Sequence, residues 1–212
     1  FDQGGNSRTL TYNGNPVYGY TGLIPWIQCD GTGDYLSRAD EAGLDILGNE
    51  TYIDTPGLTL GGWFRPEDAA SEDHIMSKWG AAGGGQYSYV ISLVGTAGGD
   101  PVRFVMSDDG TNTSFVDSVT GYSVDTWQFF AGRFNDGAVG KELAVWNNDE
   151  LTTAATARAA IFNSNADFRI GARGDGTLLY TGRASLCFLC AAALSDAAVW
   201  AIYQHTRALF KV

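Results

Sequence analysis

Basic side chains are scarce in this sequence of 212 residues. Lysine and arginine together number 13 against 24 aspartates and glutamates, so the formal net charge is −11 at pH 7. The only lysines are Lys78, Lys141 and Lys211. Binding to nucleic acid or to an anionic membrane surface requires a basic patch that neutralises phosphates. The sequence has no such patch, and we therefore expect no nucleic acid or anionic membrane as a partner.

Long apolar runs are also missing. No stretch approaches the roughly 20 apolar residues that a membrane-spanning helix needs, and no signal-peptide pattern occurs. We expect no insertion into a membrane. The sequence begins at Phe1 rather than at methionine, which predicts a processed product or a part of a longer polypeptide.

Cysteine is rare, and its odd count does not favour a disulfide framework. Cys187 and Cys190 lie three residues apart in a short apolar segment. On a strand their Cα atoms would be roughly 10 Å apart, whereas a disulfide needs less than about 7 Å. A zinc site would need two further ligands, and Cys29, His74 and His205 are scattered. We predict two buried structural thiols, and leave open whether Cys29 pairs with either of them.

Strict alternation along residues 183–191 would divide this segment between two faces. One face would carry Ala184, Leu186, Phe188 and Cys190, and the other Ser185, Cys187, Leu189 and Ala191. Both faces are largely apolar, which is typical of a strand that is covered on both sides.

Glycine and aromatic residues are abundant: 28 glycines, and 13% phenylalanine, tryptophan and tyrosine. Alternating segments such as "GLTLGGWFRP" and "QYSYVISLV" recur, and a turn at residues 108–110 predicts a hairpin. About ten to twelve strands follow one another with no helix between them. This pattern predicts an all-β, antiparallel two-sheet jelly-roll sandwich.

One short helix is predicted near the C-terminus. Ser195 is a good N-cap, and Asp196 is favourably placed in the first turn. Val199, Ile202 and Tyr203 form an apolar stripe at helical spacing.

The first 25 residues read as an extended N-terminal arm that precedes a single domain at residues 26–212. The arm is nearly uncharged and contains Tyr12, Tyr18 and Tyr20. It is either a linker or strand-like lead-in, or a segment that docks on a neighbouring subunit. In the second case the three tyrosines would form the interface, because tyrosine buries apolar area while its hydroxyl stays hydrogen-bonded.

An ordered series of motifs spans about Trp26 to Phe210. The motifs are "CDGTGDYL", "LTLGGWFRP", "HIMSKWG", "DTWQFFAGRF", "LAVWNND" and "RIGARGDGTLLYTGRASLCFLCAAALSDAAVWAIY". In this order the chain resembles the laminin-G-like, or concanavalin A-like lectin/glucanase, jelly-roll domains. The resemblance implies the jelly-roll fold, which hosts lectins, glycosidases, adhesion modules and virion proteins alike.

The resemblance also bears on calcium. Family members that hold calcium often present an acidic residue at the position that Ser185 occupies. Calcium takes six to eight oxygen ligands, mainly carboxylates, and Asp30 and Asp34 alone would leave it under-ligated. We therefore expect no metal and no cofactor, with calcium disfavoured.

Glycosidases of this fold place two or three acidic residues on one strand face, in an E-x-D-x-E pattern. None of the six glutamates begins such a motif, and neither histidine has a nucleophile at recognisable spacing. We expect no catalytic residues and no enzyme activity.

The tripeptide Arg173-Gly174-Asp175 matches an adhesion signal but occupies the family's usual glycine turn.

Sugar binding requires an aromatic platform beside polar hydrogen-bonding groups. Trp79, in a glycine-flanked loop, and Trp26, before the first strand, are the tryptophans expected to be exposed and are the candidate ligand-binding residues.

The sequence favours a non-catalytic structural or attachment domain in a repeated assembly, such as a phage virion decoration or tail protein. The alternative is a carbohydrate-binding module of a secreted or cell-surface protein, with a glycoside hydrolase a distant third. Other protein subunits or surface glycans would be the partners, on a virion or outside the cell.

Overall fold

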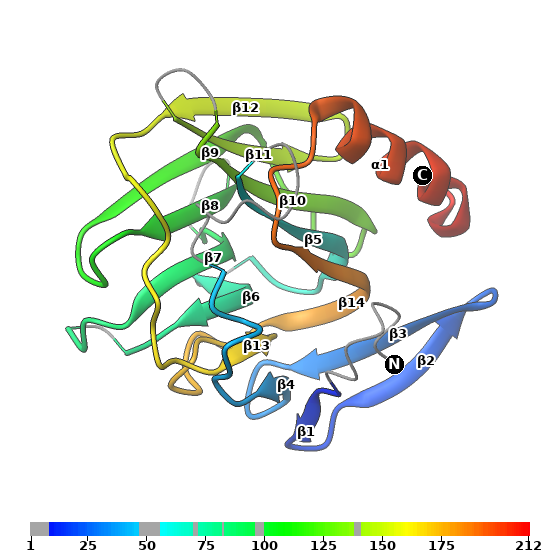
Figure 1. Ribbon diagram of the computed structural model, residues 1–212. Helices are drawn as coiled ribbons and strands as arrows, with labels where there is room; N and C mark the ends of the chain where they lie inside the picture. The colour runs from blue at the N-terminus through cyan, green and yellow to red at the C-terminus, as the bar shows by residue number, and fades with distance from the viewer. Residues whose placement is uncertain (1–8, 47–55, 70–71, 82, 96–99, 138–140) are drawn as a thin grey trace.

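Two seven-stranded antiparallel sheets and one helix make up the protein (Figure 1). The computed structural model describes residues 9–46, 56–69, 72–81, 83–95, 100–137 and 141–212. Within them, no helix is both long and apolar enough to cross a membrane.

Sheet A, in spatial order, consists of β1 (Thr11–Asn13), β4 (Tyr35–Arg38), β13 (Phe168–Ile170), β6 (Asp73–Trp79), β7 (Tyr87–Leu93), β8 (Pro101–Ser107) and β9 (Thr113–Gly121). Sheet B consists of β12 (Glu150–Ala155), β11 (Glu142–Asn147), β10 (Gln128–Asn135), β5 (Gly57–Pro66), β14 (Thr181–Cys190), β3 (Ile24–Asp30) and β2 (Val17–Thr21). The predicted all-β, two-sheet antiparallel fold class is confirmed. The described residues hold fourteen strands, more than the ten to twelve expected, because the predicted arm itself contributes β1 and β2.

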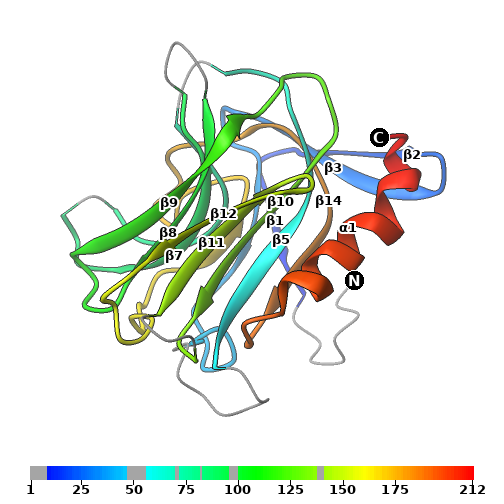
Figure 2. The ribbon, with the colours of Figure 1, turned by 90° about the horizontal axis from the view of Figure 1, so that it is seen from above.

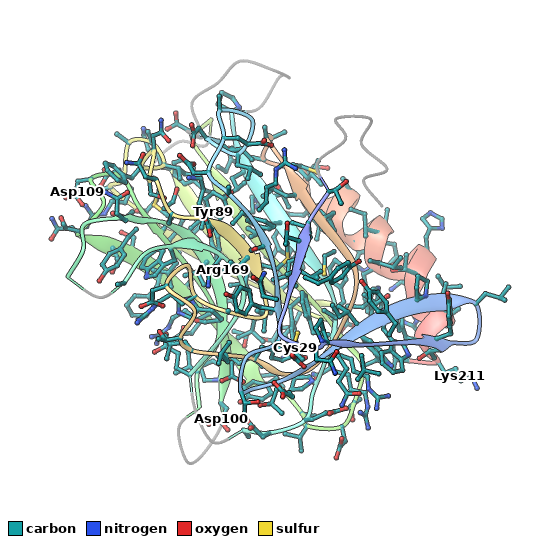
Figure 3. The ribbon with its side chains drawn as sticks, turned by 90° about the horizontal axis from the view of Figure 1, so that it is seen from below. Cys29, Tyr89, Asp100, Asp109, Arg169 and Lys211 are labelled. Atoms are coloured by element: carbon teal, nitrogen blue, oxygen red, sulfur yellow. The ribbon has the colours of Figure 1, made fainter. Side chains whose placement is uncertain are left out.

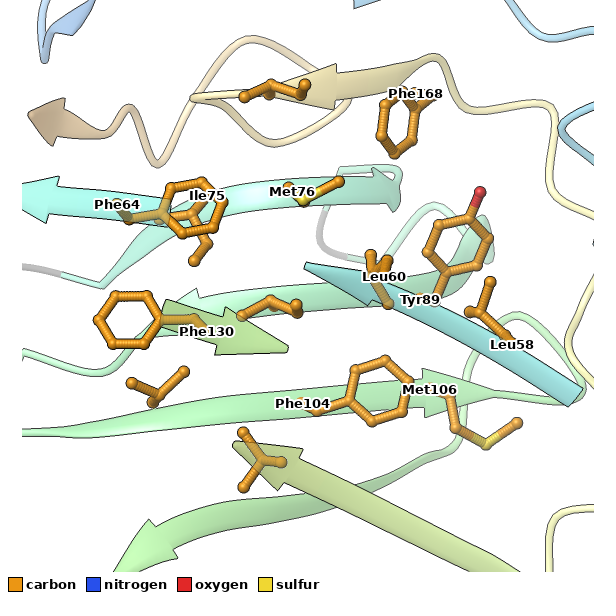
Figure 4. Close-up of a cluster of buried hydrophobic side chains, with 14 of the residues drawn as sticks. Leu58, Leu60, Phe64, Ile75, Met76, Tyr89, Phe104, Met106, Phe130 and Phe168 are labelled. Carbon is orange, nitrogen blue, oxygen red and sulfur yellow. The ribbon is translucent and has the colours of Figure 1, made fainter. Parts of the chain in front are cut away.

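The main core lies between the inner faces of the two sheets (Figure 4). Phe64 of β5 and Phe130 of β10 stack in sheet B with ring centroids 5.8 Å apart. Sheet A contributes Ile75, Met76 and Phe104, all nearly inaccessible to solvent. Alternating apolar side chains thus place one face of each strand in a close-packed interior.

Helix α1 (Asp196–Phe210) covers the outer face of sheet B (Figure 2). The Ser195 hydroxyl accepts a hydrogen bond from the Ala198 amide at 3.2 Å, which confirms the predicted N-cap. Val199 and Tyr203 are buried and pack with Trp63 in a second apolar cluster. The predicted stripe therefore does contact the sheet.

Strand β14 departs from the alternation expected for it. A β-bulge shifts its register against β5 between Ser185 and Phe188, and Leu186 adopts a positive φ of 47°. Ala184 reaches the main core before the bulge, whereas after it Cys187 packs there and Phe188 packs on the helix side. The expected grouping of Ala184 with Phe188 on one face is wrong, because the bulge adds one residue to the strand.

The buried imidazole of His74 makes the stability of this fold sensitive to pH. His74 is 3% exposed, and its Nδ1 has no hydrogen-bond partner among the described residues. Burial lowers the pKa of His74, and the carboxylate of Glu72 only partly opposes this. The unfolded chain, with a histidine pKa near 6.5, therefore binds the proton more readily than the folded chain does.

We accordingly predict that the free energy of unfolding falls as the pH is lowered from about 7.5 to about 5.5. Thermal unfolding at several pH values should show this fall in the wild type and a flatter profile in His74→Gln. Equal slopes for the two proteins would contradict the prediction.

Candidate docking surface

Strands β2 and β3 form a tight hairpin. Their register runs from Thr21 opposite Ile24 to Val17 opposite Gln28, so the loop consists of Gly22 and Leu23 alone. Gly22 has a φ of +62°, the conformation that the first position of a two-residue hairpin loop of type II′ requires. The sequence "TGLI" therefore reverses the chain locally.

The distal half of this hairpin extends beyond the rest of sheet B. β14 pairs with β3 only from Ala184 opposite Ile27 to Thr181 opposite Asp30. The β14 bulge follows directly, so Ile24 and Trp26 of β3 have β2 as their strand partner. Figures 1 and 3 show the hairpin projecting from the sandwich beside the C-terminal end of α1, near Lys211.

Trp26 connects the hairpin to the sandwich through contacts with Gly19 and Arg183. Its ring lies against Gly19, where an added Cβ would meet the ring carbon Cζ2 at 2.1 Å. The Arg183 guanidinium carbon lies 4.4 Å from the ring centroid in a cation–π contact. Trp26 was expected before the first strand as an exposed platform. It lies instead within β3 and is half-buried, and its contacts with Gly19 and Arg183 occupy much of the ring.

Several large side chains of the hairpin and of neighbouring β1 remain exposed. Tyr20 is 72% and Leu23 is 93% exposed, and Tyr12, Val17 and Tyr18 each exceed half. We call these five residues the hairpin surface. Tyr12 and Tyr18 are in edge contact with ring centroids 5.3 Å apart. Burial, together with this contact, raises the pKa of Tyr18, so its hydroxyl stays neutral.

The hairpin surface also lacks charge. No aspartate, glutamate, lysine, arginine or histidine occurs from Thr9 to Cys29, although the chain carries a net charge of −11. Edge strands in soluble proteins are usually protected by charged side chains, because their open backbone groups can pair with another chain. β2 is the edge strand of sheet B and has only β3 as a neighbour within the described residues.

The three tyrosines predicted as an interface arm all lie on this surface. Residues 1–8 of the predicted arm fall outside the described residues. The expected boundary between residues 25 and 26 falls inside β3, and the described part of the arm pairs with β4 through β1 and with β3 through β2.

Trp79 does not have the exposure that the sequence suggested. It is the last residue of β6, is 8% exposed, and stacks on Tyr87 with ring centroids 4.5 Å apart. The expectation of an exposed loop platform is wrong, because Trp79 pairs across the sheet with Tyr87. Its ring has no free face large enough for a sugar.

A small polar cavity lies at the other edge of sheet B, where the β11–β12 turn meets the end of β9. It has a volume of about 290 Å³. Its lining residues are Thr120, Gly121, Ser123, Gln128, Asn147, Asn148, Asp149 and Glu150. None of them is aromatic, and sequence reasoning did not single them out.

Hydrogen bonds hold this polar cavity in one shape. The Glu150 carboxylate accepts from the amides of Val119 and Thr120 at 2.8 and 2.9 Å. Burial raises the pKa of Glu150, but the hydrogen bond from the Thr120 hydroxyl and those from the two amides together outweigh this effect and lower the pKa. Gln128 donates to Asn147, and Asn147 donates to the carbonyl oxygen of Thr120. Asp149 also lines the cavity; it is exposed, and its carboxylate makes no hydrogen bond to any described residue.

The remaining candidates from the sequence are the three cysteines and the tripeptide Arg173-Gly174-Asp175. Burial raises the pKa of Cys29 and of Cys187 to about 12, so both thiols stay protonated, and all three cysteines are free. Arg173 and Asp175 of the adhesion-like tripeptide bind each other, with Nη2–Oδ2 at 2.8 Å. The described residues contain no cluster of three or more histidine, cysteine, aspartate or glutamate side chains that could hold a metal.

Neither a family model nor a curated protein sequence matches this chain. Solved structures do share its fold. The receptor-binding domain of botulinum neurotoxin type G has a TM-score of 0.69 at 12% identity, over 97% of this chain and 48% of that one. The binding domain of botulinum neurotoxin DC, in complex with rat synaptotagmin II, has a TM-score of 0.69 at 9% identity, over 96% and 48%. The chain spans about half the length of these domains.

A third similar structure is domain 4 of AbnA, an extracellular GH43 arabinanase from Geobacillus stearothermophilus, in complex with arabinotriose. Its TM-score is 0.63 at 18% identity, over 92% of this chain and 87% of that domain. At identities this low, the similarity shows a common fold alone, the two-sheet β-sandwich.

Proposed function

We propose that this chain is a non-catalytic attachment domain that docks on other protein subunits through the hairpin surface. The observation that carries this proposal is the uncharged, exposed hairpin, whose edge strand β2 pairs only with β3 among the described residues. An apolar surface of this kind costs free energy in water unless a partner covers it. The repeated assembly of a phage virion decoration or tail protein, with one copy among many, is the setting that suits it.

The similar folds support a binding role rather than a catalytic one. The neurotoxin domains bind receptors, and one of them is a complex with synaptotagmin II. The laminin-G-like resemblance is compatible with the same role, on a virion or at the outside of a cell.

Hydroxyl-radical footprinting with mass spectrometry tests the proposal. Tyr20 and Trp200 are both exposed in the isolated chain, at 72% and 53%. In the native assembly Tyr20 should be protected from oxidation, whereas Trp200 should react as it does in the purified chain. Equal oxidation of Tyr20 in both preparations would overturn the proposal.

The polar cavity favours a second candidate, carbohydrate binding. Carboxylates and amides form hydrogen bonds with sugar hydroxyls, and this cavity combines the hydrogen-bonded groups of Glu150, Gln128 and Asn147 with the exposed Asp149, although it lacks the aromatic platform expected from the sequence. Two proteins with structures of similar fold interact with glycans: cell entry of botulinum neurotoxin type C depends on interaction with two ganglioside molecules, and the arabinanase domain is in complex with arabinotriose.

For this second candidate we predict glycan-array binding that is at least tenfold weaker in Asp149→Ala and unchanged in Trp79→Phe. Asp149 makes no hydrogen bond to a described residue, so its replacement should leave the thermal stability intact. An array without hits, or hits that survive Asp149→Ala, would remove the cavity from consideration.

A further inference from the structure

Strand β2 has an almost symmetric sequence. Its five residues are Val17, Tyr18, Gly19, Tyr20 and Thr21. Gly19 stands at the centre, with a tyrosine on each side and a β-branched residue at each end. A strand that reads nearly the same in both directions can face an antiparallel copy of itself with like residues opposite like.

We propose that the partner on the hairpin surface is a second copy of this chain, held by antiparallel pairing of β2 with β2 about a two-fold axis at Gly19. The proposal rests on the docking function above and specifies its partner. In this register Tyr18 lies opposite Tyr20 of the second copy, and Val17 lies opposite Thr21. Sheet B then continues without interruption from one copy into the other.

The chemistry of the edge fits this arrangement. Alternate residues of an edge strand direct their N–H and C=O groups away from the sheet, where a second strand can bond them. Opposed aromatic and β-branched pairs stabilise antiparallel strands. A two-fold contact uses the same patch twice, so each favourable pair occurs twice.

Gly19 is required at the axis for a separate reason. The Trp26 ring fills the space that a side chain at residue 19 would take, and so covers the outer side of the strand. The centre of β2 therefore carries no side chain of its own on the face that Gly19 shares with Val17 and Thr21, while Tyr18 and Tyr20 project from the opposite face. The Tyr12–Tyr18 contact holds one of these rings before association.

Electrostatics explains why the contact lies here. Two copies of net charge −11 repel each other at long range. The stretch from Thr9 to Cys29 carries no charge, so its approach adds no close like-charge pair. Because salt screens the remaining repulsion, the dimer should become tighter as ionic strength rises.

Cysteine cross-linking tests the register. Residue 17 lies opposite residue 21 of the other copy, and directly opposed Cα atoms are about 4.5–5.5 Å apart, within reach of a disulfide. Residues 17 of the two copies would be four positions apart along the strands, roughly 13 Å, which is too far. Val17→Cys mixed with Thr21→Cys should therefore give a disulfide-linked dimer on oxidation, whereas each variant alone, and the wild type, should not.

Charge substitution gives an independent test in solution. Tyr18→Lys with Tyr20→Lys opposes like charges twice and should leave a monomer in light scattering. Tyr18→Lys with Tyr20→Glu opposes unlike charges in the same register and should remain a dimer. If both charge variants remained dimers, or if either cysteine variant alone formed a disulfide-linked dimer, the register and the second copy as proposed would be overturned. A wild-type monomer at every concentration also overturns the second copy, and protection of Tyr20 in the native assembly would then still support docking on another subunit.

Discussion

Replacement of Trp63 by alanine is expected to lower the free energy of unfolding by about 3–5 kcal/mol. Trp63 of β5 lies at the centre of the layer between sheet B and α1 and is 1% exposed. Its ring stacks on Phe210 at 4.5 Å and on Tyr203 at 5.9 Å, and contacts Phe129 at 5.7 Å. Its Nε1 donates a hydrogen bond to Thr206 at 2.8 Å. Truncation would leave a cavity and detach the helix from the sheet.

Trp200→Ala is the matched control, because the same side chain is removed from an exposed position of the same helix. In thermal unfolding, Trp63→Ala should lower the Tm by roughly 10 °C, as expected for a domain of this size, and Trp200→Ala should lower it by only a few degrees. Similar shifts for the two variants would show that α1 contributes little to the stability of the fold.

Replacement of Lys78 by methionine is expected to destabilise the protein by a similar amount, about 3–5 kcal/mol. Lys78 is fully buried at the end of β6. Its Nζ lies 2.7 Å from Asp40 and 3.3 Å from Asp45, and it donates to the carbonyl oxygens of Ser164 and Ala166. Methionine fills a similar volume but leaves two half-buried carboxylates and two carbonyl groups without this partner.

The contribution of the charges can be separated from that of packing. Asp40→Asn with Asp45→Asn, introduced together with Lys78→Met, removes the carboxylates that the methionine leaves behind. This triple variant should recover part of the lost stability in chemical denaturation. If the triple variant were less stable than Lys78→Met alone, the ion pairs would not be the source of the effect.

The strands of the sandwich could be predicted because the sequence signals for them are local. Apolar residues alternate along β5, β7 and β8, and glycine or aspartate stands in the sequence shortly before each of them. The helix was equally readable from Ser195 and the apolar stripe that follows it. These signals depend on residues close together in sequence, where period and capping determine the outcome.

The errors arose where distant strands decide the structure. The bulge in β14 follows from its pairing with β5, and nothing near Leu186 in the sequence marks a positive φ. Trp79 was taken for a loop residue because glycines follow it, whereas its pairing with Tyr87 continues β6. The buried Lys78, within "HIMSKWG", did carry a signal: a single charge inside an apolar strand requires a partner.

The hairpin surface could be predicted only in part. The hairpin itself was not predicted, because residues 1–25 were read as an extended arm, although glycine at the first position of a two-residue loop is typical of a type II′ turn. The three tyrosines were predicted as a possible interface. The projection of the hairpin beyond the sheet depends on where β14 bends away from β3. That geometry, which leaves Tyr20 and Leu23 uncovered, comes from the three-dimensional fold.

The central claim is that the hairpin surface binds a second copy of this chain, and sedimentation of the purified chain over a range of concentrations tests it most directly. The wild type should sediment as an associated species at micromolar concentration. Tyr20→Ser with Leu23→Ser should be monomeric with an unchanged Tm, whereas Val119→Ser with Val124→Ser, which removes exposed apolar side chains elsewhere, should associate like the wild type. Association that persists in the hairpin variant, or that is lost equally in the control, would contradict the account.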